Sequence, residues 1–232
     1  MTTISTTTRA LDHGRGLQAV LLDMDGTLVD TEDFWWQAEA SLFAELGYAL
    51  DENDRAHVVG GPMTRVIDYL LAATGVDLSP ADLTVLINQR FVDLLAGGVP
   101  LMPGAERLLN TLAAHGVPAA LVSASQRHII DIVLRSLGAH HFAFTVAGDE
   151  VPRTKPYPDP YLEAARRFGA EPGRCVVVED APTGVRSAEA AGCPVIAVPS
   201  VAVIEPAPGR LVLPSLEHID LELLRSLVTS RV

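Results

Sequence analysis

Short apolar runs alternate with longer amphipathic segments along most of the chain. The apolar runs, which predict buried strands, cover residues 17–22, 118–122, 144–146, 175–178, 194–198 and 210–213. The segments with helical periodicity cover residues 105–114, 126–137, 160–168, 183–191 and about 219–227. Glycine follows most of these helical segments, as is common at helix ends. Strands that alternate with helices predict an α/β fold with a mostly parallel, Rossmann-like sheet.

Between residues 30 and 100 the pattern changes to helical segments without a strand. Helical periodicity covers residues 34–46, 64–74 and 80–96, and glycines follow each segment. Ser79 followed by Pro80 predicts an N-cap and a first helical turn. We therefore expect an α-helical cap domain at residues 31–99, inserted into a core made of residues 17–30 and 100–232. Residues 1–16 are expected to form a disordered N-terminal tail.

Composition and charge narrow the class of protein. The hydrophobic fraction of 48% is enough to bury a sizeable core. The formal net charge of −12 disfavours nucleic acid and anionic membranes as partners. No apolar run approaches the roughly 18 residues that a membrane span needs, and two cysteines are too few for a disulfide framework. We expect a cytoplasmic monomer that acts on a small molecule.

Two aspartates follow the first predicted strand. Asp23 and Asp25 stand beside Gly26, which allows the backbone to turn. The pair could form an Asx turn or cap a helix. In open α/β sheets, however, ligands bind outside the carboxyl ends of the strands. A carboxylate there could be a nucleophile, a metal ligand or both.

A second acidic pair, Glu179 and Asp180, follows the strand predicted at residues 175–178. Asp180 could cap the next helix. If both acidic pairs lie at the same edge of the sheet, their charges repel, and a hard divalent cation would relieve the repulsion. Magnesium prefers oxygen ligands of this kind. Each pair makes a functional interpretation of the other stronger.

Two further positions suit a phosphoryl group. Ser123 ends another predicted strand, where it or Ser125 could cap the following helix or bind an anion. Lys155 lies in a proline-rich loop and is the only lysine among seventeen basic residues. A loop lysine is usually a solvated charge. Where arginine has replaced lysine elsewhere, this ammonium is a candidate counter-ion that a guanidinium cannot replace.

In this order the motifs resemble those of the haloacid dehalogenase superfamily of phosphohydrolases, over roughly residues 18–200. The matching residues are Asp23 and Asp25 with Gly26, Ser123, Lys155 with the following Pro-Tyr-Pro-Asp-Pro-Tyr, and Glu179-Asp180 with Gly184. A long insertion after the first motif is similar to the subclass with a helical cap. The resemblance implies a magnesium-dependent phosphatase that hydrolyses a small phosphorylated metabolite, such as a sugar or polyol phosphate.

The resemblance also implies residue roles. Asp23 would form an aspartyl-phosphate, and Asp25 would act as acid and then base. Mg²⁺ would be held by Asp23, the Asp25 carbonyl and Asp180, with Glu179 bound directly or through water. The residues implied to bind substrate are Ser123, Ala124 and Lys155 in the core and Glu32, Trp35 and Arg65 in the cap.

Two alternatives remain open at this point. The first is a β-phosphoglucomutase-like phosphosugar mutase. That family has a histidine where this chain has Trp35, and a lysine and an arginine where it has Val59 and Met63, although Arg65 could substitute for the arginine. Glu32 with Trp35 instead resembles phosphatases of the 2-deoxyglucose-6-phosphate type. The second alternative is a non-catalytic binding protein on the same fold, which would not need all of the motif acids and Lys155.

Overall fold

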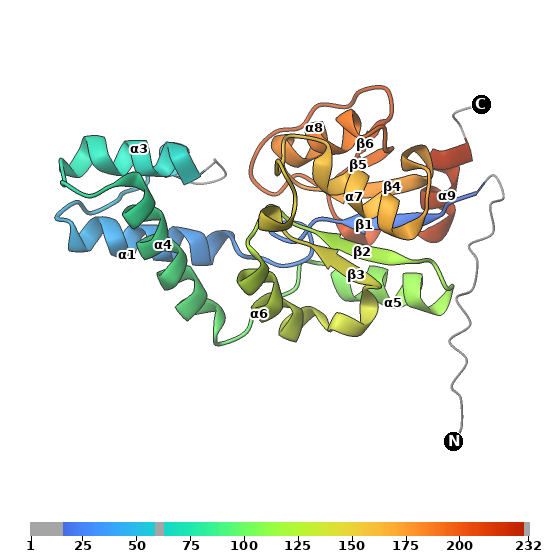
Figure 1. Ribbon diagram of the computed structural model, residues 1–232, viewed down its shortest axis with the longest axis horizontal. Coiled ribbons are helices and arrows are strands. Elements are labelled where there is room, and N and C mark those ends of the chain that lie inside the picture. Colours follow the sequence, from blue (N-terminus) through green and yellow to red (C-terminus); the bar gives the residue numbers. More distant parts are fainter. Residues whose placement is uncertain (1–15, 59–62, 230–232) are drawn as a thin grey trace, which may run out of the picture.

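A twisted parallel sheet forms the centre of the computed structural model, which describes residues 16–58 and 63–229 (Figure 1). Within these residues the sheet has six strands in the order β3-β2-β1-β4-β5-β6. The strands are β1 Ala19–Leu22, β2 Ala119–Val122, β3 Phe144–Val146, β4 Cys175–Glu179, β5 Val195–Ala197 and β6 Arg210–Val212. All neighbours pair in parallel, so the expected fold class is confirmed.

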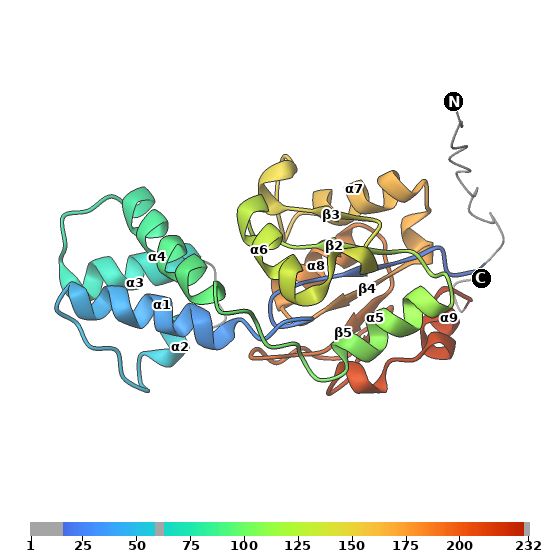
Figure 2. The same ribbon diagram turned by 90° about the horizontal axis from the view of Figure 1, so that it is seen from below.

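Helices cover both faces of the sheet (Figure 2). The elements that supply the covering residues are α5 Ala105–Ala114, α6 Arg127–Leu137 and α9 Leu221–Thr229 on one face, and α7 Asp159–Phe168 and α8 Pro182–Ala190 on the other. The alternation along β1 explains this arrangement. Val20 and Leu22 belong to the first apolar cluster, whereas Ala19 and Leu21 belong to the second. A fully buried parallel strand therefore needs apolar residues at every position.

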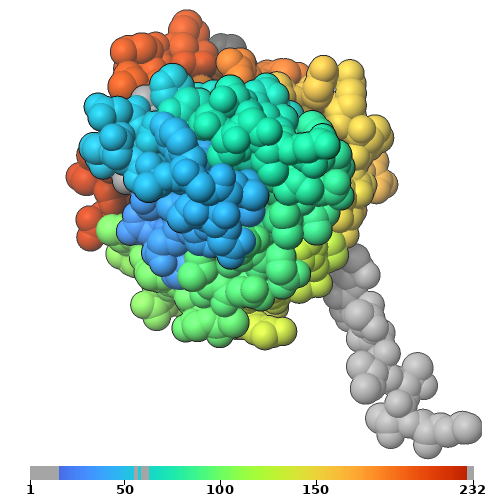
Figure 3. Space-filling view, turned by 90° about the vertical axis from the view of Figure 1, so that its left-hand side faces the viewer, coloured from blue at the N-terminus to red at the C-terminus, as the bar shows by residue number. Residues whose placement is uncertain are grey.

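Four helices between β1 and α5 lie beside the sheet and form what we call the helical insert. They are α1 Glu32–Glu45, α2 Arg55–Val58, α3 Met63–Thr74 and α4 Pro80–Leu95. Apolar side chains such as Phe43, Leu70 and Phe91 are fully buried within it. Ser79 caps α4 as expected, because its hydroxyl accepts a hydrogen bond from the Asp82 amide at 3.1 Å. Viewed from its own end, the insert occupies the middle of the molecular face (Figure 3).

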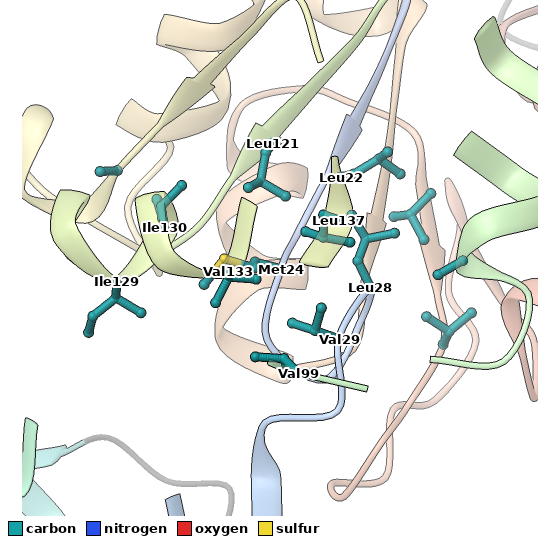
Figure 4. Packing of buried hydrophobic residues seen from close by; sticks show 14 of the residues in the cluster. Leu22, Met24, Leu28, Val29, Val99, Leu121, Ile129, Ile130, Val133 and Leu137 are labelled. Carbon is teal, nitrogen blue, oxygen red and sulfur yellow. The ribbon is translucent and has the colours of Figure 1, made fainter. Parts of the chain in front are cut away.

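Two chain crossings join the insert to the sheet domain. The Asp30 amide donates to the Pro100 carbonyl at 2.9 Å, which pairs the outgoing and returning segments. Val29 and Val99 are buried beside Met24 and α6 (Figure 4). The crossings are thus held by main-chain pairing and an apolar contact. The division into a core and a cap domain at residues 31 and 99 stays a prediction.

Most predicted elements are found within two residues of their expected bounds. Helix α2 was not predicted, nor were the short 3-10 helices, which are η1 Ala139–His141, η2 Gly148–Glu150, η3 Pro172–Arg174 and η4 Leu216–His218. A single turn carries too little periodicity to be recognised. The expected N-terminal tail lies outside the described residues, apart from Gly16. Among the helices in the described ranges, none has the length and apolarity to cross a membrane.

Candidate active site

The register of the sheet brings three motif residues to one edge. Leu22 pairs with Leu121 on β2 and with Val178 on β4. Asp23 and Ser123, which directly follow β1 and β2, and Glu179, the last residue of β4, therefore lie at the same edge of the sheet. This edge is also a topological switch point of the sheet, because β2 and β4 lie on opposite sides of β1. Such a position is the usual ligand site of an open parallel sheet.

A tight turn after β1 makes room for the second acidic pair. Gly26 has a φ of 72°, in the left-handed region that favours glycine. A Cβ atom at this position would lie 2.2 Å from Oδ2 of Asp180. Glycine is therefore required both for the turn and for the close approach of the β4 end.

Three buried carboxylates meet at this edge. Ligand oxygens of Asp23, Glu179 and Asp180 lie within 4.8 Å of one another. Burial, followed by the charge of Glu179, raises the pKa of Asp23 to about 7. Burial and the charges of Asp23 and Glu179 raise the pKa of Asp180 to about 9. A divalent cation relieves such a crowded set of oxygen donors, so the residues present fit a metal of this class.

Lys155 partly neutralises the cluster. Its Nζ donates to Oδ1 of Asp23 at 2.5 Å, to Oε1 of Glu179 at 2.6 Å and to the Val122 carbonyl at 2.9 Å. Burial alone would lower the pKa of Lys155, but Asp23 and Glu179 raise it above its ordinary value. The ammonium thus donates all three of its protons, to acceptors at the ends of β1, β2 and β4. The Lys155 side chain is only 5% exposed.

The Glu179 carboxylate is held by donors on both oxygens. Oε1 also accepts from the Tyr161 hydroxyl at 2.9 Å, and Oε2 accepts from the amides of Asp180 and Ala181. A Cβ atom at Gly184 would lie 1.6 Å from Oε1, so this glycine makes space for the carboxylate. The N-cap position of α8 is Ala181, so Asp180 does not cap it. Asp180 instead accepts a hydrogen bond from the Ser200 hydroxyl.

Asp25, two residues after Asp23, accepts hydrogen bonds from three hydroxyl groups. Thr31 donates to Oδ1 at 2.9 Å, while Ser123 and Ser125 donate to Oδ2 at 3.2 and 2.9 Å. Burial raises the pKa of Asp25, and the three hydroxyl groups oppose that shift. Neither serine is the N-cap of α6, which is Gln126. The two serines therefore orient Asp25 rather than cap the helix.

A cleft of about 620 Å³ separates this edge of the sheet from the helical insert. We call its two sides the core wall and the insert wall. The core wall includes Asp23, Asp25, Ser123, Ser125, Ala124, Thr154, Lys155, Glu179 and Asp180. The insert wall includes Glu32, Trp35, Trp36, Glu39, Val58, Met63, Thr84 and Asn88. The volume falls within the range of pockets that bind small molecules.

The cap residues predicted to bind substrate are only partly brought together. Glu32 and Trp35 line the cleft, and the Trp35 ring also stacks on Phe91 at 3.6 Å between ring centroids. Arg65 is exposed and is absent from the described residues that line the cleft. The loop at residues 59–62, which includes Val59, lies outside the described residues. Roles for these side chains in binding stay predictions.

Sequence reasoning did not select Glu39 or Asn88, which also line the cleft. Glu39 follows Glu32 by seven residues, so both lie on one face of α1. That spacing is visible in the sequence and could have identified Glu39. No comparable signal identifies Asn88, because its position depends on how α4 packs against α1.

The chain is similar in sequence and in structure to proteins of known families. The family model described as haloacid dehalogenase-like hydrolase matches residues 20–198. A bifunctional riboflavin kinase/FMN phosphatase of Arabidopsis thaliana is 35% identical over 189 residues, which are 78% of this chain. The match covers 48% of that relative, so the chain spans about half its length.

Two further similarities cover most of both proteins. The mitochondrial (DL)-glycerol-3-phosphatase 1 of Arabidopsis thaliana is 34% identical over 209 residues, covering 84% of this chain and 69% of the relative. A crystal structure of mutant CbbY from Rhodobacter sphaeroides, in complex with xylulose-(1,5)bisphosphate, is 29% identical. It superposes with a TM-score of 0.77 and covers 90% of this chain and 99% of that one.

Proposed function

The chain belongs to the haloacid dehalogenase-like hydrolase family, and on that premise we propose that it is a magnesium-dependent phosphatase. Its substrates would be small phosphate monoesters of sugars or polyols, cleaved through an aspartyl-phosphate. The observation that carries the proposal is the meeting of Asp23, Glu179 and Asp180 within 4.8 Å, beside the buried ammonium of Lys155. The glycerol-3-phosphatase relative supports phosphate monoesters as the substrate class.

The first half of the reaction transfers the phosphoryl group to the protein. A carboxylate oxygen of Asp23 forms a bond to phosphorus, and the bond from phosphorus to the leaving oxygen breaks. Asp25 gives its proton to that oxygen, so the alcohol leaves neutral. Lys155 and Ser123 lie beside Asp23 and Asp25, and they would bind oxygens of the transferring group.

The second half restores the enzyme. Asp25 takes a proton from a water molecule, whose oxygen attacks phosphorus and breaks the bond to Asp23. The sum is one ester and one water converted to one alcohol and one phosphate. Asp23, Asp180 and Glu179 would hold Mg²⁺, which supplies positive charge against the phosphoryl oxygens when bound.

The test is phosphate release from a panel of sugar and polyol monophosphates with Mg²⁺. We expect turnover that a chelator abolishes and added Mg²⁺ restores. The same enzyme is then given β-glucose 1-phosphate with glucose 1,6-bisphosphate, and we expect no isomerisation. Formation of glucose 6-phosphate faster than phosphate release would replace the proposal with a mutase. A cytoplasmic location and a monomeric state stay predictions from the sequence.

A further inference from the structure

Glu39 occupies an unusual place for a carboxyl group. It lies on α1 between core residues such as Ala38 and Leu42, and only 4% of its surface is exposed. The small exposed part faces the cleft, because Glu39 is one of the residues that line it. Burying a carboxyl group is unfavourable unless polar partners compensate for lost water. An apolar residue would suit the packing of α1 better, so the carboxyl group points to a role in the cleft.

The electrostatic surroundings of Glu39 fit a neutral ligand. Burial, followed by the charge of Glu32, raises the pKa of Glu39 to about 8, and Arg65 opposes the shift. Near neutral pH the group is therefore largely protonated. A carboxylic acid both donates and accepts hydrogen bonds, as does an alcohol. A carboxylic acid and an alcohol are therefore complementary hydrogen-bonding partners, whereas a carboxylate and a phosphate are not.

Helix α4 adds polar groups to the same wall. Asn88 is partly buried and lines the cleft. Its side-chain amide makes no hydrogen bond to another residue of the described ranges. Thr84, one turn earlier, donates its hydroxyl proton to the Pro80 carbonyl at 2.8 Å and keeps lone pairs available. The Trp35–Phe91 stack fixes α4 against α1. These groups can bind hydroxyl groups in several orientations.

Charge on the insert wall argues against a second anionic group. Two of its side chains, Glu32 and Glu39, are acidic, and neither lysine nor arginine occurs among the described residues that line it. A distal phosphate there would meet the carboxyl groups of Glu32 and Glu39 and no basic side chain among the described residues of the wall. An uncharged polyhydroxy chain meets only hydrogen-bonding groups and the apolar faces of Trp35 and Met63.

We propose that Glu39, with Asn88, binds hydroxyl groups of the leaving alcohol and so selects phosphate esters of uncharged polyols. This inference rests on the proposed phosphatase function and names its substrate class more narrowly. Glu39 acts on a part of the substrate remote from the phosphorus. Its contacts therefore form in the ground state and persist in the transition state, so their loss raises KM more than it lowers kcat.

The test compares hydroxylated substrates with matched alkyl phosphates. Glycerol 3-phosphate and sorbitol 6-phosphate are set against propyl phosphate and hexyl phosphate, with p-nitrophenyl phosphate as a reference. We expect Glu39→Leu to lower kcat/KM for the preferred polyol phosphate about 10- to 100-fold, the range for losing a strong hydrogen bond. The alkyl and aryl phosphates should change less than about twofold. Asn88→Leu should act in the same direction and serves if Glu39→Leu fails to fold.

Glu45→Gln is the matched control, because Glu45 lies on the same helix, 65% exposed and paired with Arg90. This variant should leave kcat/KM unchanged for every substrate. Equal losses on polyol and alkyl phosphates, or no loss in either variant, would overturn the inference, as would a wild-type enzyme that prefers the alkyl phosphates. If the wild type releases phosphate from no substrate, including p-nitrophenyl phosphate, the proposed function itself is wrong.

Discussion

The two walls of the cleft are built in different ways. On the core wall, Lys155, Glu179 and Asp25 each make three or more hydrogen bonds, to groups from several strands and loops. On the insert wall, the Trp35 ring is fixed by stacking. The side chain of Asn88 has no polar partner in the part of the chain that the structure describes. A preorganised wall suits the chemical step, which needs fixed charges. A wall with unused polar groups suits the selection of a leaving group.

The two walls also hold their acidic groups for different reasons. The core wall gathers three carboxylates around one lysine, an arrangement that repels itself until a cation binds. The insert wall buries Glu39 beside Glu32, with Arg65 as the opposing charge. We therefore expect changes on the core wall to abolish all reactions, and changes on the insert wall to alter substrate choice and stability.

The largest effect is expected for Asp23→Asn. The substitution keeps the shape of the side chain but removes the nucleophilic oxygen, so turnover should fall at least about 10⁴-fold on every substrate. The pKa of Asp23 is raised by burial and by Glu179, so its charge is unfavourable without metal. We therefore expect the melting temperature of the metal-free variant to equal or exceed that of the wild type. Phosphate release and thermal unfolding measure the two effects.

Asp131→Asn is the control for this comparison, because Asp131 is exposed on α6, where it pairs with Arg127. It should change neither turnover nor unfolding appreciably. A folded Asp23→Asn enzyme with near wild-type turnover would show that the core wall does not supply the nucleophile.

The next effect is expected for Lys155→Arg. The ammonium contacts Asp23, Glu179 and the Val122 carbonyl within 2.9 Å, in a space that is almost closed to solvent. A planar guanidinium cannot direct donors to these three acceptors at such distances. We expect a loss of about a hundredfold or more in kcat. Arg153→Lys, in the same loop but 57% exposed, is the matched control and should stay within about twofold of wild type.

A smaller effect on activity, with a clear loss of stability, is expected for Gly184→Ala. The added methyl group would lie 1.6 Å from Oε1 of Glu179 and must displace that carboxylate. We expect a loss of about 1–3 kcal/mol in the free energy of unfolding, together with weaker binding of Mg²⁺ in activity titrations. At Gly173 the nearest atom to an added Cβ is 3.9 Å away, so Gly173→Ala should leave both quantities nearly unchanged. Equal behaviour of the two variants would contradict the geometry.

The core wall could be predicted from the sequence because its residues directly follow apolar strands. Once Asp23, Ser123 and Glu179 are assigned to strand ends, a parallel sheet must bring them to one edge. Lys155 could be assigned to the site without structural information, because it is the only lysine in the chain. The hydrogen bonds from Thr31 and Ser125 to Asp25 were not foreseen, because they depend on the path of the turn after β1.

The insert wall was harder to predict because it depends on contacts between helices. Periodicity shows which face of α1 is apolar, but it does not show which edge of that face meets the sheet domain. Glu39 was missed, although its spacing from Glu32 places both residues on one face of α1. Arg65 was expected in the site on its position relative to a glycine loop, and it lies outside the described lining of the cleft.

The sharpest contrast between the walls is expected in the pH dependence of stability around Glu39. The pKa of Glu39 is raised from 4.5 to about 8 by burial and by Glu32, while Arg65 lowers it. Between these two values the folded protein holds a proton that the unfolded chain has released. Wild-type stability should therefore fall as pH rises, by at most about 1.4 kcal/mol per pH unit from this group.

Glu39→Gln removes this dependence, since the amide keeps the shape but does not ionise. The melting temperature of the variant minus that of the wild type should rise between pH 5 and pH 8 and level off above pH 8. Glu45→Gln, at an exposed position on the same helix, is the control and should give a flat difference. Thermal unfolding at half-unit pH steps measures both curves. A flat difference for Glu39→Gln would mean that water reaches the carboxylate freely, and the insert wall would then present a charged group to the substrate instead of a neutral acid.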